Sequence, residues 1–392
     1  MDLSLSEEHE ALRATVEDFA RKEVAPVIGE LYERGEFPYQ LVARMGVMGL
    51  FGLPIDEEHG GMGGDYFALC LALEELARID SSVAITLEAG VSLGAMPLYR
   101  FGTDEQKRRW LPALAAGGRL GAFGLTEPGG GSDAGATRTT ARLDGDEWVI
   151  NGSKAFITNA GTDITSIVTV TAITGNEITG NEITGDEEDG RKEISAIVVP
   201  TGTPGFRVSQ KYSKVGWCAS DTRELFFDDC RVPAENLLGE RGRGYAQFLS
   251  ILDEGRVALA ALSVGLAQGC VDESVRYARE REAFGSPIGS YQAIQFKIAD
   301  MEARAHTARL AYYAAAVKML RGEPFKKEAA IAKLVASNAA MDNARDATQV
   351  FGGYGFMNEY PVGRFYRDAK ILEIGEGTSE VQRMLIARHL GL

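Results

Sequence analysis

The sequence predicts an α+β multidomain protein, with helical regions at both ends of the chain and a β domain between them. Apolar residues recur at helical spacing near both termini, and strand-like alternation replaces that spacing in the middle. A length of 392 residues is enough for two or three domains. The pattern predicts an N-terminal α-helical domain over 1–120, a middle β domain over 121–238 and a C-terminal α-helical domain over 239–392.

The N-terminal region is predicted to be a series of helices. Ser4 followed by Glu7 fits a capping box at a helix start. The apolar face of that helix comprises Leu12, Val16, Phe19, Ala20 and Val24. A second helix is predicted over 65–79, after a glycine-rich loop at 59–64.

The middle region is richer in glycine, threonine and valine, and strands are predicted over 148–150, 166–170 and 194–199. Asp144-Gly145 and Asn151-Gly152 are predicted turns between strands. A five-residue unit, Ile-Thr-Gly-Asn-Glu, occurs three times in succession over 173–187, with Asp for Asn in the third copy. This period is too short for a solenoid, so we expect an exposed hairpin or loop between two strands.

The C-terminal region returns to helical spacing over long segments. Residues 292–320 contain no proline or glycine, which predicts one long helix. Pro324 interrupts the pattern, and a further helix is expected from about 326 to 350. These segments predict a bundle of long helices.

Charge and composition exclude several functions. A net charge of -15 and a pI of about 4.9 argue against nucleic acids and anionic membranes as partners. The four cysteines form no C-x-x-C pair and the four histidines are scattered, so no metal site is expected. Neither a signal peptide nor an apolar stretch of 18 residues is evident, so a cytoplasmic protein without a membrane span is expected.

A glycine-rich run over 126–133 (Thr-Glu-Pro-Gly-Gly-Gly-Ser-Asp) matches a weak form of the dinucleotide fingerprint when Ala134 is included. Pro128 precedes the glycines and strand-like alternation follows, so the strand-to-helix context of a Rossmann site is missing. Ala134 also excludes a G-x-S-x-G elbow around Ser132. Two interpretations remain: a loop that approaches a planar ligand closely, or a cluster of β-turns.

Three segments further along could bind a ligand, and each has an ordinary structural alternative. Arg281, ahead of Gln292, could hold a phosphate or form a solvated ion pair. The glycines of 349–355 permit close backbone approach, or they cap a helix. Glu376, between two glycines, could reach a ligand, or it could be a favourable anion near a helix N-terminus.

Together these motifs resemble the acyl-CoA dehydrogenase family from about residue 5 to the end of the chain. The matching runs are 125–128 (Leu-Thr-Glu-Pro), 156–159 (Phe-Ile-Thr-Asn), 281–292, 349–355 and 376–378 (Glu-Gly-Thr). The resemblance implies an N-terminal α-helical domain, a middle β-barrel or sandwich and a C-terminal four-helix bundle. It also implies FAD as cofactor, an acyl-CoA substrate, an electron-transferring flavoprotein as electron acceptor, and a homotetramer.

The resemblance also implies roles for single residues. FAD would be contacted in its own subunit by Phe123, Leu125, Thr126, Ser132, Phe156, Thr158, Thr378 and Glu380. FAD of a neighbouring subunit would be held by Arg281, Phe284, Gln292, Gln349 and Gly353. The CoA substrate would lie against Ser132, Asp253, Arg256 and Gly377. Many relatives have Trp where this chain has Phe156, so stacking on the flavin is kept while the indole N–H is lost.

The implied reaction is α,β-dehydrogenation, in which Glu376 takes the α-proton, a hydride passes to flavin N5, and trans-2-enoyl-CoA forms. Relatives resembling isovaleryl-CoA dehydrogenase place the base where this chain has Gly255, and Glu254 is one residue, about 100° of helix, away from that position. Gly255 and Gly375 would leave space near the α-carbon, which favours short or branched acyl groups. A flavin oxidase or monooxygenase, or a non-catalytic FAD-binding protein, are alternatives that Glu376 argues against.

Overall fold

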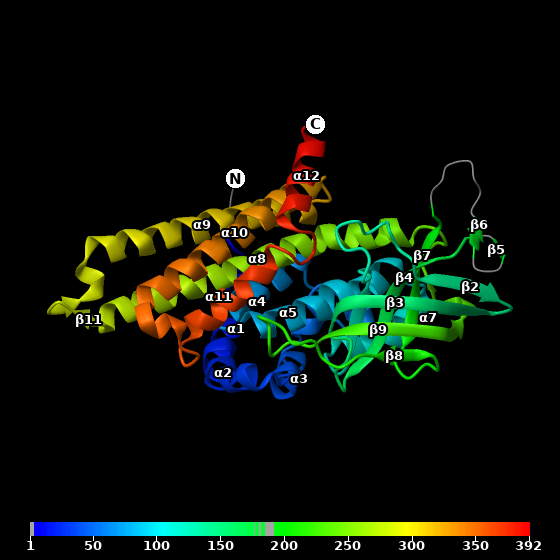
Figure 1. Cartoon of the computed structure of the whole chain (residues 1–392), viewed down its shortest axis with the longest axis horizontal. Coiled ribbons are helices and arrows are strands. Elements are labelled where there is room, and N and C mark those ends of the chain that lie inside the picture. The colour runs from blue at the N-terminus through cyan, green and yellow to red at the C-terminus, as the bar shows by residue number, and fades with distance from the viewer. Residues whose placement is uncertain (1–3, 176, 180–181, 185–191) are drawn as a thin grey trace.

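The computed structural model describes residues 4–175, 177–179, 182–184 and 192–392. The two helical regions pack against one another, and the β-sheet lies at one end of the molecule (Figure 1). Long helices extend from the neighbourhood of the sheet to the opposite end. The predicted architecture, with a β domain between two helical regions, is therefore confirmed.

The N-terminal region begins with helices of ordinary amphipathic pattern. It comprises α1 (Glu7–Phe19), α2 (Ala25–Arg34), α3 (Tyr39–Val47), α4 (Tyr66–Ala77), α5 (Ser81–Glu88), α6 (Met96–Phe101) and α7 (Asp104–Ala115), with π-helical turns at Ala20–Val24 and Ala89–Ala95. The capping prediction was wrong: Ser6, not Ser4, is the N-cap of α1 and accepts a hydrogen bond from the N–H of His9 at 3.2 Å. Because the helix begins at Glu7, that residue stabilises the first turn through its charge.

Helices α4 and α5 form the inner layer of this region. Every residue of both helices is buried, because α4 packs between α1 and α8 (Gly244–Glu280) and α5 also packs on α8. The segment Ser81–Phe101 is long and apolar enough to span a membrane, which the sequence reading missed. In the fold, 94% of its apolar window is buried inside the protein, which is typical of a core helix.

The β region forms a mixed sheet. Its strands are β1 (Leu120–Gly124), β2 (Thr140–Asp144), β3 (Glu147–Thr158), β4 (Thr165–Ile173), β5 (Glu177–Thr179), β6 (Glu182–Thr184), β7 (Ile194–Pro200), β8 (Phe206–Val208), β9 (Thr222–Pro233) and β10 (Leu237–Leu238). The order across the main sheet is β10-β7-β4-β2-β3-β9-β8, and β1 pairs with β4 in parallel. The three predicted strands fall within β3, β4 and β7, and β5 pairs with β6 as the hairpin expected for the repeat, whose turn lies outside the described residues.

One of the two predicted turns was wrong. Asp144-Gly145 forms the β2–β3 hairpin turn, with Gly145 at φ 65°. Asn151-Gly152 instead lies inside β3, at an irregularity in its pairing with β9. Gly152 has φ 144°, and a Cβ there would lie 2.6 Å from Thr139 Oγ1, so the glycine serves a β-bulge and a close strand approach.

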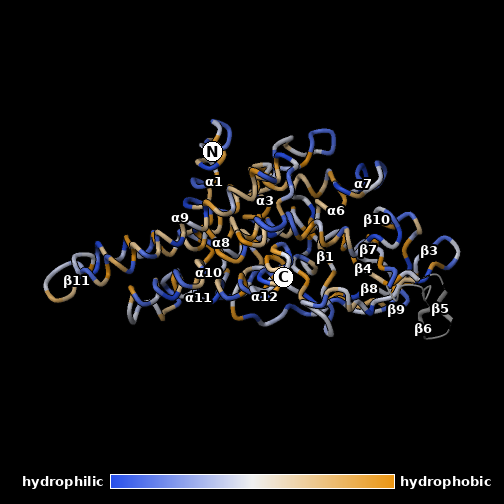
Figure 2. The backbone as a smooth tube through the Cα atoms, turned by 90° about the horizontal axis from the view of Figure 1, so that it is seen from above, coloured by the Kyte–Doolittle hydropathy of each residue, from blue (hydrophilic) through white to orange (hydrophobic). Residues whose placement is uncertain are grey.

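Long helices make up the C-terminal region: α8, α9 (Gln292–Leu320), α10 (Lys326–Phe351), α11 (Pro361–Leu372) and α12 (Ser379–His389). Helix α9 has the predicted bounds, and α10 extends one residue beyond its predicted end. Helix α10 packs on α8, α9, α11 and α12, and its buried positions are mostly alanine, which permits close helix approach. Hydrophobic residues recur along these helices where they meet (Figure 2).

Candidate active site

Glu376 lies in the turn between α11 and α12. Its φ of 52° is in the left-handed region, which is unusual for a residue with a side chain, and Gly377 follows at φ 92°. The Lys333 ammonium and the Gln382 side-chain amide each donate a hydrogen bond of 2.8 Å to the carbonyl of Gly377. Thr378 caps α12 with its side chain. These contacts hold a backbone conformation that a free turn would not favour, as is common at functional sites.

The carboxyl group of Glu376 points into the protein against α8. Its Oε2 is buried, and within the described chain it has no hydrogen-bond partner. A Cβ placed on Gly255 would lie 2.6 Å from this oxygen, so the glycine provides room for the carboxyl. Burial raises the pKa of Glu376, and Glu88, Lys333 and Arg256 oppose the rise. An unsatisfied carboxyl with a perturbed pKa in such a setting has the properties of a general base.

Glu254 is engaged elsewhere. Its Oε1 lies 3.0 Å from Nη2 of Arg100, on α6. This is the direction expected from the rotation of one residue along α8 relative to Gly255. The structure thus gives Glu254 an ion-pair partner through Oε1, although its Oε2, like Oε2 of Glu376, has no hydrogen-bond partner in the described chain.

Two of the predicted substrate residues pair with one another on α8, and one of them, Arg256, acts on the base. Asp253 and Arg256 are buried and form an ion pair one turn apart on α8. Lys326, at the start of α10, lies with its Nζ 3.0 Å from Oδ2 of Asp253. Gly377 is adjacent to Glu376, whereas Ser132 is exposed on the loop that follows β1. The structure therefore places Arg256 and Gly377 beside the base, and Asp253 is linked to them through its ion pair with Arg256.

The predicted flavin residues of the first β segment lie on β1 and just beyond it. Phe123 is buried, and its ring stacks on that of Phe248 of α8 with 3.8 Å between the centroids, which makes the ring part of the core. Leu125 and Thr126 are partly exposed. The carbonyl of Thr126 accepts a hydrogen bond from the N–H of Ala155 at 2.8 Å, which ties the segment to β3.

Phe156 and Thr158 end strand β3, and Phe156 presents an aromatic face to the surface. It is 67% exposed and has φ 61°. The ring of Tyr212 lies 5.4 Å away, centroid to centroid. An exposed aromatic side chain in a costly backbone conformation is typical of a binding surface rather than of packing.

Helix α5 connects the end of β3 to the base. Immediately after β3, the side-chain amide of Asn159 donates a 3.0 Å hydrogen bond to the carbonyl of Thr86. Two residues further along the same helix, Glu88 faces Glu376. The end of β3 and the base are thus both in contact with one buried helix.

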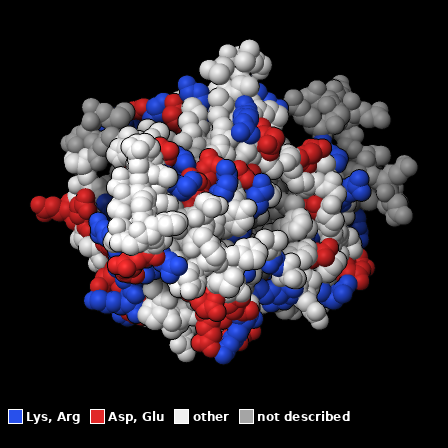
Figure 3. All heavy atoms as spheres, turned by 60° about the vertical axis from the view of Figure 1, so that its left-hand side comes forward, with Lys and Arg blue, Asp and Glu red and all other residues white. Residues whose placement is uncertain are grey.

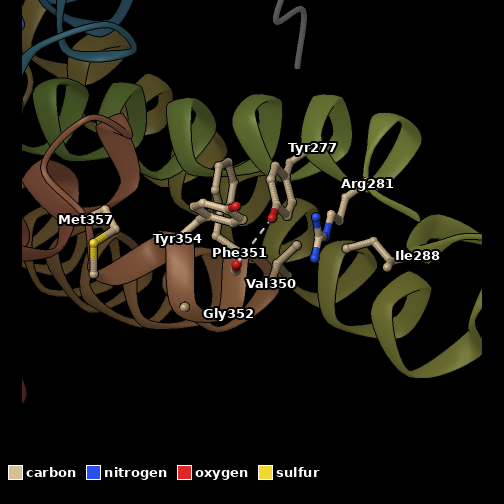
Figure 4. Close-up of a pocket in the computed structure, with 9 residues that line it drawn as sticks. Tyr277, Arg281, Ile288, Val350, Phe351, Gly352, Tyr354 and Met357 are labelled. Atoms are coloured by element: carbon tan, nitrogen blue, oxygen red, sulfur yellow. Dashed lines mark hydrogen bonds between the residues drawn. The ribbon is translucent and has the colours of Figure 1, made fainter. Parts of the chain in front are cut away.

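The remaining predicted cofactor residues lie at the far end of the helical bundle, where β11 (Glu282–Ala283) and β12 (Ser286–Pro287) join α8 to α9 (Figure 1). This group is Arg281, Phe284, Gln292, Gln349 and Gly353. Arg281 lines a pocket of about 520 Å³ with Tyr277, Phe351 and Tyr354 (Figure 4). Phe284 is 98% exposed. Figure 3, which brings this side of the molecule forward, shows uncharged surface among scattered acidic and basic side chains.

The structure therefore divides the predicted cofactor residues into two groups. One group lies around β1, β3 and the start of α12, where Thr378 is the N-cap and Glu380 is in the first turn. The other lies around Arg281, and the length of the bundle separates it from the sheet (Figure 1). Across the described chain, no group of three or more His, Cys, Asp or Glu could hold a metal ion.

Three charged residues near the base were missed from the sequence: Glu88, Lys326 and Lys333. Glu88 and Lys333 are fully buried, and each interrupts an apolar helical face. A charged residue at a position that the helical period assigns to the core was the available signal, because buried charges require a partner or a function.

Comparison with known proteins identifies the family. Profiles of the acyl-CoA dehydrogenase N-terminal, middle and C-terminal domains match residues 6–118, 122–230 and 242–391. A probable acyl-CoA dehydrogenase of Bacillus subtilis is 50% identical, with 100% of both chains covered. Butyryl-CoA dehydrogenase from Megasphaera elsdenii is 42% identical, with a TM-score of 0.93 and 100% of both chains covered.

A chain from a structure of the electron transferring flavoprotein of Acidaminococcus fermentans is also 42% identical, with a TM-score of 0.93, covering 100% of this chain and 99% of that chain. The match to the middle domain includes Phe156, and the match to the C-terminal domain includes Arg281 and Glu376. The chain belongs to the acyl-CoA dehydrogenase family.

Proposed function

We propose that this protein is an FAD-dependent dehydrogenase of short acyl-CoA thioesters, with Glu376 as the base that removes the α-proton. The observation that carries the proposal is the buried Oε2 of Glu376, which has no partner in the described chain and faces the space left by Gly255. Family membership makes acyl-CoA dehydrogenation the reaction, and the geometry makes Glu376 the strongest candidate for the base.

The chain's own residues would bind and orient the reactants. FAD, when bound, supplies the two-electron redox chemistry by accepting the β-hydride at N5. Phe156 and Thr158 would pack on the flavin ring, and Thr126, Ser132, Thr378 and Glu380 would hold the rest of the cofactor. The exposed face of Phe156 and the partly exposed Thr126 fit a planar ligand laid along β1 and β3.

The second group of cofactor residues supports an assembly of several chains. Arg281, Phe284, Gln292, Gln349 and Gly353 lie at the opposite end of the bundle from the sheet, so they would hold the FAD of a neighbouring copy. An arginine with an adjacent glycine-lined pocket suits a phosphate-bearing ligand. We therefore expect a homotetramer, or at least a dimer, with closed symmetry.

The residues near the base and the similar proteins support a substrate and an electron acceptor. Asp253, Arg256, Gly377 and Ser132 would contact the CoA part, and the N–H of Glu376 would stabilise the thioester oxygen as charge develops. The Glu376 carboxyl already occupies the room beside Gly255, so the support for a short acyl group is the similarity to a butyryl-CoA dehydrogenase. The similarity to a chain studied with an electron transferring flavoprotein supports such a flavoprotein as the acceptor.

The test is flavin reduction by a panel of acyl-CoA thioesters without oxygen. Purified protein should be yellow with about one FAD per chain, and butyryl-CoA should bleach it rapidly. Electron-transferring flavoprotein should reoxidise it, and oxygen should do so slowly. Protein that takes up no FAD, or holoprotein that no acyl-CoA reduces, would overturn the proposal, and rapid reoxidation by oxygen would indicate an oxidase instead.

A further inference from the structure

Glu88, the last residue of α5, has a titratable side chain to which the proposed reaction gives no role. It is completely buried, inside the apolar segment Ser81–Phe101. Neither of its carboxyl oxygens has a hydrogen-bond partner of standard geometry among the described residues. An ionised carboxylate in such a place is costly, because burial removes its hydration without replacement.

The group that faces Glu88 is the candidate base. A Cβ placed on Gly255 would lie 2.6 Å from Oε2 of Glu376 and 3.8 Å from Oε1 of Glu88, so the two oxygens approach the same point on α8. If both carboxyl groups were ionised, they would repel one another, and both of these oxygens would lack a hydrogen-bond donor. A single proton held between them removes both problems, because it supplies the missing donor.

The surrounding charges decide which carboxyl keeps the proton. Lys333 and Arg256 act on Glu376 and favour its ionised form. Burial, and then the Glu376 carboxylate, raise the pKa of Glu88 well above its ordinary value.

The Ser92 side chain opposes this rise at Glu88, but no cation among the described residues does so. The other titratable groups packed nearby are Tyr66 and Cys70 of α4, whose pKa values burial raises, and Glu254 of α8, which pairs with Arg100. None of these three groups supplies a positive charge to Glu88.

We propose that Glu88 is protonated in the resting enzyme and donates a hydrogen bond to the Glu376 carboxylate. Glu88 is then a positioning residue: it orients the base and stabilises its ionised form inside the protein. The inference rests on the proposed role of Glu376. When Glu376 accepts the α-proton, the pair becomes neutral and the Glu88 proton stays in place.

Two variants test whether Glu88 acts as a hydrogen-bond donor, as a negative charge or only through packing. Glu88→Gln keeps a hydrogen-bond donor of the same size, and Glu88→Met removes it. The pH dependence of flavin reduction is measured for both holoenzymes. The acid limb is the pH range in which the rate of flavin reduction falls as pH is lowered. We expect this limb in Glu88→Gln to stay near that of the wild type. In Glu88→Met it should move to higher pH by about one unit, so the rate falls roughly tenfold at pH values below the limb and recovers above it.

Two outcomes would overturn the proposal. Acid limbs that move to lower pH in both variants would show that Glu88 is ionised and repels the base. Limbs that move in neither variant would show that Glu88 merely fills space.

A second measurement does not depend on turnover. The infrared spectrum of the resting holoenzyme at neutral pH should contain the C=O band of a neutral carboxylic acid, and Glu88→Gln should lose it. Glu75→Gln is the matched control, because Glu75 is as buried on α4 but pairs with Arg13, so the band should persist. A band that survives in Glu88→Gln contradicts the proposal.

The two proposals fail separately. Wild-type flavin that no acyl-CoA reduces would refute the proposed function, while the infrared band still decides the state of Glu88. Rapid reduction together with an unchanged band would refute the inference on Glu88 alone.

Discussion

The turn that carries Glu376 and the far end of the helical bundle differ in how much of a site one chain provides. At the turn, charges are buried and matched: Lys333 holds the backbone, and Arg256 is paired with Asp253. At the far end, Arg281 borders an open pocket and Phe284 projects into solvent. The comparison indicates that one chain positions the base by itself. Cofactor binding, in contrast, depends on what covers the far end of the bundle.

Substitution of Glu376 is the sharpest test of the turn that carries the base. Glu376→Gln should keep FAD and bind acyl-CoA but lose roughly 10²–10⁴-fold in the rate of flavin reduction, the usual contribution of a general base. Stopped-flow spectroscopy without oxygen measures this rate. Glu254→Gln is the control, because Glu254 pairs with Arg100, and its rate should change far less. The opposite ranking would move the base to Glu254.

For the second region, Arg281→Ala should weaken FAD retention without altering the chemistry. A charge-assisted hydrogen bond contributes about 1.5–3 kcal/mol, so FAD should dissociate about 10–100-fold more readily. The measurement is FAD fluorescence released on dilution. Arg279→Ala, an exposed residue two positions earlier that does not line the pocket, should retain FAD. Equal retention in both variants would mean that Arg281 does not contact the cofactor.

Phe284→Ser tests whether another chain covers the far end. Burying a phenylalanine side chain contributes about 1.5–3 kcal/mol, so the subunit dissociation constant should rise by roughly tenfold or more. Light scattering over a range of protein concentrations measures the change in mass. Val47→Ser, at an exposed apolar residue of α3, is the control. A variant that assembles as tightly as the wild type would argue that Phe284 stays in solvent.

The smallest expected effect concerns pH and Lys333. Burial raises the pKa of Glu376, so its active, ionised form is lost as pH falls through that raised pKa, and flavin reduction should slow on the acid side. Lys333→Met removes a cation that opposes the rise in the pKa of Glu376, so the acid limb should move to higher pH. A move of one pH unit would lower the rate of flavin reduction about tenfold at pH values below the limb. Lys318→Met, at a partly exposed ion pair with Glu328, should leave the limb in place. A limb unaffected by Lys333→Met would remove Lys333 from the electrostatics of the base.

The fold could be predicted where local pattern decides structure. The bounds of α9 followed from a stretch without proline or glycine, and three strands followed from alternation. Asn151-Gly152 was misread because a β-bulge and a tight turn require similar residues, and long-range pairing with β9 selects between them. Ser4 was misread because Ser6 offers an equivalent cap two residues later.

The site could be predicted less completely. Glu376, Arg281 and Phe156 lie in motifs, so the sequence identifies them. Glu88 and Lys333 lie in apolar helices far from any motif, and their importance comes from distances that exist after folding. The separation of Arg281 from the sheet is likewise a property of the length and direction of α8, which no short pattern encodes.

The fit between Gly255 and Glu376 also limits how this enzyme can change. Any side chain at position 255 would compete for the volume that the Glu376 carboxyl already occupies, at 2.6 Å from the first added carbon. The two positions are therefore alternatives, and their substitutions should be strongly non-additive. A lineage that moves its base from the turn before α12 to α8 must first remove the carboxyl at position 376, so the route passes through an ancestor with little activity.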